Sequence, residues 1–507
     1  MKKTLIKKWV LGTVLAILVI SIGSCIRVNS KINQHQGAKT ELVNTSIFNS
    51  INSPLAITNI SVLSKDCTKM LDSLTVLIKE GKIVSIDKRT NVTNEYTNID
   101  GTGQYLIPGL IDTHVHLKKS RNDLLLFLAN GVTTVGEMFG DKSHLEWREE
   151  AKSGTLSPNL YVATRKLGSE KGMISKIKSW FGAPKSYTSQ RKARKAVRKF
   201  KEQGYDAIKL TNLNPEIYEA IVDEAVKQNI PAIGHLGPEV GLDGLYNSGQ
   251  SQLAHVEEIV KNTMNEFGVV YYNKTEEYLQ FLKERADTIA IKIKEKNIVV
   301  SSTIWLVESF PKQKLELDSF IKTIPLEYAN PGIVEGSSIT RGWTPGNNYY
   351  ENLNAKNDPE LQKRVKGYWE TYVKAHHIMT KALIKHNVIV VAGTDANVAC
   401  ATPGFSLHQE LHSLNKVGLT NSRVLQSTTV HAGEWMQYNI GKIEVGYNAD
   451  LVILKKNPLD DITNTKTIRS VIINGKLLNR TTLDNMLESV KEANSRSRKM
   501  SINQYIN

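Results

Sequence analysis

Four histidines stand where strand-like stretches of the sequence end. His114 and His116 are two residues apart in the run Asp-Thr-His-Val-His, so both imidazoles would lie on one side of a strand. His235 and His255 each follow a short apolar run and are 20 residues apart. Histidines that face one another inside a fold need a partner, and a divalent metal ion is the partner they most often have. The pattern therefore indicates a metal site.

Asp395 and Lys209 add two further side chains to this set. Asp395 ends the run Val-Ala-Gly-Thr-Asp and could cap the following helix, but beside four histidines we favour a metal ligand and general base. Lys209 points inward from its strand if Ile208 points outward. Bound cations would lower the pKa of this amine. A neutral amine can add CO₂ to become a carbamate, whose two oxygens can bridge two metal ions.

These residues need a scaffold that brings strand ends together. Helix-like spacing of apolar residues fills most gaps between eight short β-branched stretches, as over 189–203. Such alternation predicts an α/β fold, a (β/α)₈ TIM barrel over 109–435, whose active site would lie at the C-terminal ends of the strands. The expected strands are Leu106–Leu117, Val132–Phe139, Leu160–Thr164, Ala207–Leu210, Pro231–Leu236, Gln252–Glu258, Asn297–Trp305 and Val388–Ala396.

Two stretches with β-like patterns flank the barrel, 53–108 before it and 436–480 after it. The first carries a hairpin signal at Glu80-Gly81 and the second a turn signal at Asn474-Gly475. All-β segments on either side of a barrel can pair with each other. We therefore expect one small composite β-sandwich.

The order HxH, Lys, His, His, Asp on successive strands resembles the amidohydrolase superfamily, specifically its binuclear type with a carboxylated lysine. The resemblance covers nearly all of 53–480. It includes the flanking runs Gly-Lys-Ile-Val-Ser-Ile at 81–86 and Gly-Lys-Ile-Glu-Val-Gly-Tyr-Asn-Ala-Asp at 441–450. The chain looks most like the prolidase and imidazolonepropionase-like branch, which the run Ser-Leu-His-Gln-Glu-Leu-His-Ser-Leu at 406–414 also fits.

The resemblance implies two divalent metal ions, with zinc the first candidate and manganese or cobalt also compatible with the ligands. Carboxylated Lys209 and a hydroxide would bridge the two ions, which would activate that water and polarise a substrate carbonyl. Asp395 would carry the proton of the water to the leaving nitrogen. The implied ligands are His114, His116 and Asp395 for the more buried ion, and His235 and His255 for the more exposed one.

The reaction implied by the resemblance is cleavage of amide C–N bonds in small substrates such as dipeptides or N-acyl amino acids. Imidazolonepropionase-like ring opening is less favoured, because it resembles a one-metal site that has no need of Lys209. Lactone or ester hydrolysis stays open, as does a non-catalytic surface binding protein on the same scaffold, although a binding protein needs few of these ligands. Arg165, Lys166 and Arg341 are candidates for holding a substrate carboxylate, and none of the three stands out.

The N-terminus predicts export. Four lysines in the first eight residues precede the apolar run Trp9–Ile22, whose 14 residues suit a signal peptide and fall short of the ~20 residues of a spanning helix. Ile-Gly-Ser-Cys at 22–25 resembles a lipobox, so 1–24 would be a lipoprotein signal peptide and Cys25 would carry the lipid. We expect a lipid-anchored protein on the periplasmic or cell-surface face of the envelope, with a polar tether over 25–52.

The remaining features are less specific. The net charge is +15 over 507 residues, or +11 without the first 24, and three cysteines exclude a disulfide framework. The basic run 185–201 lacks interleaved aromatic residues, so we expect a solvated outer helix and no nucleic-acid partner; anionic lipid head groups are the second interpretation. The aromatic-rich stretch 306–387 is interpreted as a lid and the seventh helix, with packing or a homo-oligomer contact as alternatives. The end of the chain, 481–507, is expected to be a polar tail that starts as a short surface helix.

Overall fold

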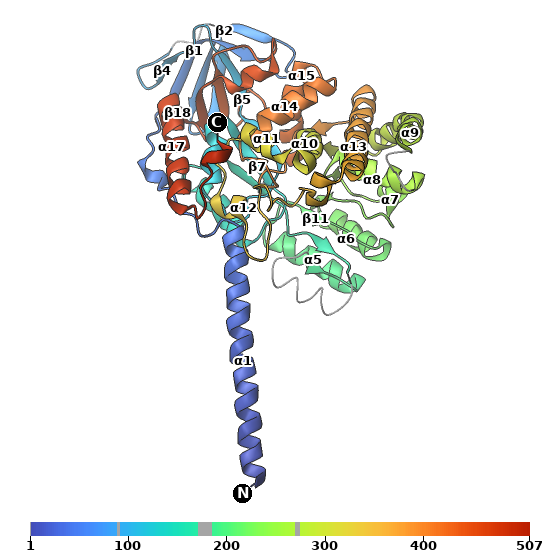
Figure 1. Cartoon of the computed structure of the whole chain (residues 1–507). Helices are drawn as coiled ribbons and strands as arrows, with labels where there is room; N and C mark the ends of the chain where they lie inside the picture. Colours follow the sequence, from blue (N-terminus) through green and yellow to red (C-terminus); the bar gives the residue numbers. More distant parts are fainter. Residues whose placement is uncertain (1, 89–91, 171–184, 269–273, 507) are drawn as a thin grey trace.

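The computed structural model of the chain describes residues 2–88, 92–170, 185–268 and 274–506 (Figure 1). At its centre, parallel strands alternate with helices. Bridges from Val115 to Ala396 and from Ala163 to Ala207 close the paired strands into a ring. The TIM-barrel prediction is thus confirmed. The barrel strands in order are β6 (Leu110–Val115), β7 (Val132–Glu137), β8 (Asn159–Val162), β11 (Ile208–Leu210), β12 (Ala232–Gly234), β13 (Gln252–Leu253), β14 (Val299–Ser301) and β15 (Val390–Val391).

Helices cover the outside of the barrel, and apolar side chains such as Ile111, Ile233 and Val391 form a buried cluster from its strands. Two short strands, β9 (Leu167–Gly168) and β10 (Lys185–Ser186), extend the ring beside β11. The covering helices are α2 (Asp123–Ala129), α3 (Lys142–Lys152), α5 (Gln190–Glu202), α6 (Pro215–Lys227), α7 (Gly241–Tyr246), α8 (Val256–Phe267), α9 (Thr275–Glu295), α13 (Pro359–Lys385), α14 (Phe405–Val417), α15 (Asn421–Ser427) and α16 (Val430–Met436).

Strands from both flanks form one eight-stranded sheet beside the barrel. Its order is β18-β17-β16-β5-β1-β2-β3, with β4 beside β1, and the flanks meet where β16 runs antiparallel to β5. The two flanks therefore pair as expected, and the sheet folds back on itself, because Lys82 of β3 also bridges Asn448 just before β16. The strands are β1 (Leu55–Leu63), β2 (Met70–Lys79), β3 (Lys82–Asp87), β4 (Thr97–Asp100), β5 (Tyr105–Pro108), β16 (Leu451–Leu454), β17 (Ile468–Ile473) and β18 (Lys476–Asn479).

Gly109 divides the stretch that the sequence presented as a single barrel strand, Leu106–Leu117. The residues before it belong to β5 of the sheet, and those after it to β6 of the barrel. A Cβ at Gly109 would lie 2.0 Å from Thr133 Oγ1, so a side chain has no room at this crossing point. The glycine lets the chain pass directly from one domain to the other.

The insertion after β14 has an apolar cluster of its own, which includes Phe320, Ile333 and Trp343 and contacts Cys400 in the loop after β15. Its location against a loop at the C-terminal end of the barrel agrees with the expected place over the mouth. Helix α13 then returns the chain to the last strand. The elements are α10 (Ile304–Leu315), α11 (Leu317–Phe320), η3 (Ile321–Thr323), α12 (Pro331–Glu335) and η4 (Leu353–Asn357).

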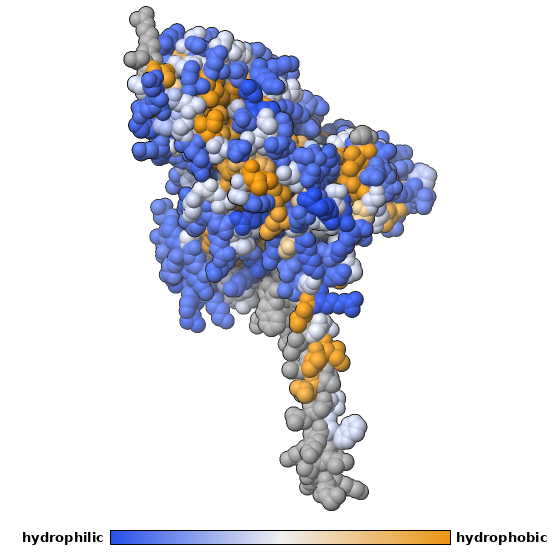
Figure 2. All heavy atoms as spheres, turned by 90° about the vertical axis from the view of Figure 1, so that its left-hand side faces the viewer, coloured by the Kyte–Doolittle hydropathy of each residue, from blue (hydrophilic) through white to orange (hydrophobic). Residues whose placement is uncertain are grey.

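Helix α1 (Lys2–His35) projects from one end of the body (Figure 1). Exposed hydrophobic side chains lie along it, among them Leu15, Val19 and Ile26 (Figure 2). Among the described residues, no helix is both long and apolar enough to cross a membrane. Within the stretch expected to be a polar tether, the helix continues to residue 35, and residues 36–52, with η1 (Thr45–Ile47), lie against the body.

The C-terminal segment begins with a surface helix, as expected, and this helix packs on the body. Helix α17 (Arg480–Ser497) buries Leu483, Met486 and Val490, which recur at helical spacing, and packs on α2. The short turns η5 (Ile462–Lys466) and η6 (Asn503–Tyr505) complete this end of the chain. The buried apolar side chains hold this helix against the body.

Candidate metal centre

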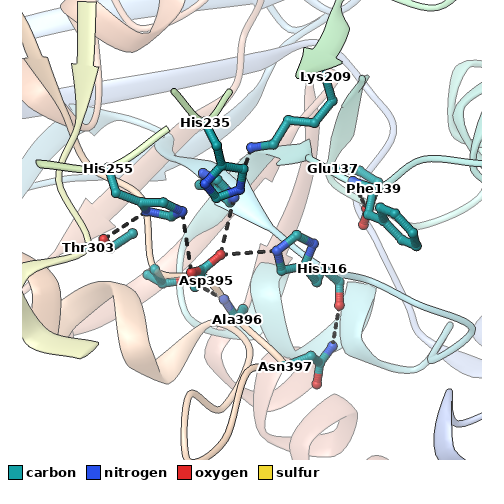
Figure 3. Close-up of polar contacts among 12 residues, drawn as sticks. His116, Glu137, Phe139, Lys209, His235, His255, Thr303, Asp395, Ala396 and Asn397 are labelled. Atoms are coloured by element: carbon teal, nitrogen blue, oxygen red, sulfur yellow. Dashed lines mark hydrogen bonds and ion pairs between the residues drawn. The ribbon is translucent and has the colours of Figure 1, made fainter. Parts of the chain in front are cut away.

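The six side chains singled out in the sequence come together at the C-terminal end of the barrel (Figure 3). The two histidines of the HxH pair lie at the end of β6, and Lys209 lies in the middle of β11. The other three follow β12, β13 and β15. The structure therefore brings together His114, His116, Lys209, His235, His255 and Asp395.

The Asp395 carboxylate is the centre of the cluster. Its Oδ1 lies 3.2 Å from His114 Nε2 and 3.1 Å from His116 Nε2, and its Oδ2 lies 3.6 Å from His255 Nε2. Ligand atoms of His114, His116 and Asp395 all lie within 4.8 Å of one another, a spacing at which they could hold one ion. The ring of His235 is further out, 5.3 Å from the ring of His255 between centroids.

The backbone around Asp395 is held in an unusual conformation. Asp395 has a φ of +56°, in the left-handed region, and its N–H donates to the carbonyl oxygen of His114 at 2.8 Å. Two residues earlier, a Cβ at Gly393 would lie 2.7 Å from the Cβ of His114, so this strand can approach β6 only with glycine there. The segment after β15 therefore lies directly against β6, which brings Asp395 to His114.

A buried carboxyl group below the cluster joins the same two strands. Asp112 accepts from Thr394 Oγ1 at 2.6 Å, from Thr394 N at 3.1 Å and from His114 N at 3.3 Å. Burial raises the pKa of Asp112 to about 8, although these three hydrogen bonds oppose the rise. Asp112 precedes the HxH pair by two residues, and the sequence analysis assigned it no role.

Lys209 lies inside the barrel, as the alternation of its strand predicts. Its neighbours Ile208 and Leu210 pack into the apolar layer outside the strands, and the side chain of Lys209 is fully buried. Its Nζ lies 3.4 Å from His114 Nε2. Burial, together with the ammonium of Lys166, lowers the pKa of the Lys209 amine to about 7. The amine is therefore available in its neutral form near physiological pH.

The two outer histidines are oriented by partners that the sequence analysis did not identify. Glu258 Oε1 accepts from His235 Nδ1 at 3.0 Å, and Thr303 Oγ1 lies 2.9 Å from His255 Nδ1. These contacts leave the Nε2 atoms to face the cluster. The sequence marks Glu258 only weakly as a partner of His235, because a glutamate in the first turn of a helix is common for electrostatic reasons alone.

The donor set fits divalent metal ions. Burial lowers the pKa of His255 to about 3 and the pKa values of His114 and His235 well below the usual range, so these imidazoles are neutral, the form that binds a metal. Burial alone would raise the pKa of Asp395, but the imidazoles that face it, among them His116 through a hydrogen bond, hold that pKa well below its usual range. Neutral imidazoles around an ionised carboxylate are the ligands that zinc prefers.

Lys166 is a further cation beside the cluster. It follows β8 and directly precedes β9, whose Leu167 pairs with Leu210 next to Lys209. Lys166 interacts electrostatically with Asp395, His235 and Lys209. Within the described parts of the chain, its ammonium has no hydrogen-bond or ion-pair partner. Arg341, by contrast, donates from Nη1 to the carbonyl oxygen of Asn348 at 3.3 Å.

The fold and this cluster define a class: a (β/α)₈ barrel protein with a set of metal-ligand side chains at its mouth. The family model described as the amidohydrolase family matches residues 105–478. The chain belongs to the amidohydrolase family. The sequence-based assignment to this family is thereby confirmed, and the match spans the barrel and its junctions with the sheet.

Known proteins are similar at low identity. The chain is 25% identical to a 5′-deoxyadenosine deaminase of Methanosphaera stadtmanae over 455 residues, 82% of this chain and 93% of that protein. Among solved structures, a bottromycin amidohydrolase has a TM-score of 0.65 at 18% identity, covering 87% of this chain and 90% of that one. A prolidase in complex with N-methylphosphonate-L-proline has a TM-score of 0.61 at 18% identity, covering 84% and 100%. The two structures establish a shared fold.

Proposed function

We propose that this protein is a metal-dependent hydrolase that cleaves the amide C–N bond of small substrates with a free carboxylate, such as dipeptides or N-acyl amino acids. The observation that carries the proposal is the convergence of three histidines on Asp395, with His235 and the buried Lys209 beside them. The family supports a hydrolase. Lys166 is the evidence for a carboxylate on the substrate, because an unpaired ammonium beside the cluster can bind an anionic group.

The ligands divide into two sets around Asp395. In the proposal, His114, His116 and Asp395 would hold one ion, His235 and His255 would hold a second, and Lys209 in its carboxylated form would be a further ligand. Divalent ions there would polarise the scissile carbonyl and lower the pKa of a water molecule. The neutral form of Lys209 that burial favours is the form that can add CO₂.

The protein supplies the proton transfer and the positioning. Asp395 is ionised and faces the centre of the cluster, so it can accept a proton from the attacking water and deliver it to the leaving nitrogen. Lys166 would hold the substrate carboxylate at the mouth. The insertion lies against the loop after β15, where it can limit the size of the substrate.

A second candidate is deamination, in which the C–N bond that breaks releases ammonia. It is favoured by the similarity to a 5′-deoxyadenosine deaminase along 93% of that protein. A nucleoside carries no carboxylate, so this reaction leaves Lys166 without a role. The two candidates thus differ in the substrate group that faces Lys166.

The experiment uses the full chain purified in detergent with bicarbonate present, and counts metal ions per chain by elemental analysis. We expect about two ions in the parent and clearly fewer in Lys209→Ala. A panel of dipeptides, N-acyl amino acids and 5′-deoxyadenosine then tests the reaction. Release of ammonia from the nucleoside with no cleavage of the amides would replace the proposal with the deaminase. A folded protein that holds no metal would overturn both.

A further inference from the structure

The base of helix α1 is fixed to the rim of the barrel mouth. Lys119 N, three residues after His116, donates to the carbonyl oxygen of Gln36 at 2.9 Å. Just beyond, Thr40 Oγ1 donates to Asn330 Oδ1 of the insertion at 2.8 Å. The chain that leaves the helix therefore bonds both to the loop after β6 and to the insertion.

The last turns of α1 also face the next two loops of the mouth. Across a small cavity of about 150 Å³, Asn33 and Gln36 face Asp141 of the loop after β7 and Arg165 of the loop after β8. Helix α1 thus begins its projection from the same end of the barrel that carries the metal-ligand cluster. A membrane attachment at α1 would therefore keep the barrel mouth near the membrane.

The length of α1 between Cys25 and His35 limits the distance from the barrel mouth to a lipid anchor at Cys25. Ten residues of continuous helix separate Cys25 from His35, and at a rise of 1.5 Å per residue they span about 15 Å. A lipid on Cys25 would keep the mouth within about 15 Å of the membrane surface. An uncleaved α1 lying in the interface, with its exposed Leu15, Val19 and Ile20, would hold the same end towards the lipid.

Helix α5, which is rich in lysine and arginine, lies towards the end of the body from which α1 projects (Figure 1). Its basic side chains divide into two rows. Arg194 and Arg198 turn towards α6, where Arg198 pairs with Glu224 at 2.9 Å. The other row is exposed and, among the described residues, has no ion-pair partner; it consists of Arg191, Lys192, Lys195 and Lys199.

We propose that the protein sits on an anionic membrane surface with its barrel mouth towards the lipid, held by α1 and oriented by the exposed row of α5. Three of the four cations recur every four residues, so they lie on one face of the helix and can reach one surface together. Each lysine or arginine near an anionic surface increases partitioning by a factor of about five. The active site would then open towards the space between the protein and the lipid. This proposal does not depend on the reaction.

The test is lysine footprinting of the full chain by acetylation and mass spectrometry. The chain is placed on vesicles of phosphatidylcholine alone, or of phosphatidylcholine with phosphatidylglycerol. We expect Lys192, Lys195 and Lys199 to be protected on the anionic vesicles and to regain reactivity at high salt. Internal controls are Lys283, Lys294 and Lys296 in and after α9, which Figure 1 shows away from α1, and which should react equally on both vesicles.

Matched variants keep the test independent of local unfolding. One variant changes the four exposed cations of α5 to glutamine, and the other changes Lys283, Lys292, Lys294 and Lys296 in the same way. Partitioning to anionic vesicles should fall more than tenfold in the first and little in the second. Equal reactivity of the α5 lysines on both vesicles, or an equal loss in both variants, would overturn the proposal. Protection by duplex DNA but not by anionic vesicles would also overturn it.

Discussion

Glu258 Oε1 lies 3.0 Å from His235 Nδ1, and its second oxygen accepts from Leu236 N at 2.8 Å. The carboxylate therefore fixes both the ring and the backbone of the histidine that stands furthest out in the cluster. Because the Nδ1 atom is occupied in this way, Nε2 is the nitrogen left for a metal ion. The outer half of the site depends on a residue outside the ligand set.

Glu258→Gln should weaken metal binding by about 10- to 100-fold, because an amide cannot accept both hydrogen bonds. The measurement is metal retention during titration with a chelator. Glu257→Gln is the matched control: it is the same change one residue earlier, at a carboxylate that accepts from Tyr372 OH and pairs with Lys261. Equal metal loss in the two variants would show that Glu258 acts only through the stability of α8.

Asp395→Asn should lower kcat by at least about 100-fold, since the amide cannot accept the proton from water. The measurement is the initial rate on the best amide found in the substrate panel, at saturating metal. Metal content is measured beside it, because the same side chain is a proposed ligand. Activity that recovers fully when metal is added in excess would assign Asp395 to binding and leave the proton transfer to another group.

The cluster itself was predictable because two strong regularities apply to it. Strand alternation places His114 and His116 on the same side and turns Lys209 inward between Ile208 and Leu210. Barrel strands then bring their C-terminal ends to one place, however distant they are in the sequence. Both rules require only the positions of the strands, and short β-branched runs in the sequence predict those positions.

Other features depend on contacts that no local pattern contains. Asp112 has its role because Thr394, which follows the last barrel strand, donates to it from 282 residues away in the sequence. The segment after α1 looked like a tether because it is polar, yet Asn330 and Asn122 bind it to the body by hydrogen bonds. For α17 a local pattern exists, because Leu483, Met486 and Val490 recur at helical spacing in an otherwise polar segment.

Lys166→Gln should raise KM about tenfold or more for an N-acyl amino acid, because a charge-assisted contact to the carboxylate is lost. The same acyl group on a neutral amide should be cleaved with nearly unchanged KM. Arg341→Gln is the comparison, as that guanidinium already donates to the backbone at Asn348. If Lys166→Gln affects the neutral and the charged substrate alike, Lys166 acts through the electrostatics of the cluster and not through the substrate carboxylate.

Asp450 should make the stability of the whole chain depend on pH. It accepts from Asn474 N at 2.7 Å in the sheet and from Asn159 Nδ2 at 2.8 Å in the barrel, so it links the two domains. Burial raises the pKa of Asp450 to about 6, against 3.8 for an ordinary aspartate, even though both hydrogen bonds oppose the rise. The native state therefore holds this proton more tightly than the unfolded chain does. The stabilising contribution is complete below about pH 3.8 and is lost as the pH rises through about 6.

Asp450→Asn removes this titration, so its stability relative to the parent should increase as the pH rises from about 4 to about 7. The relative gain across that window should be at most about 3 kcal/mol, the equivalent of the pKa shift. The measurement is the urea midpoint of both proteins at several pH values, which cancels the other buried carboxyl groups. Asp460→Asn, at an exposed aspartate ten residues further on, is the control and should give a flat difference. A flat difference for Asp450→Asn as well would mean that its two hydrogen bonds, and not burial, decide the charge of this group.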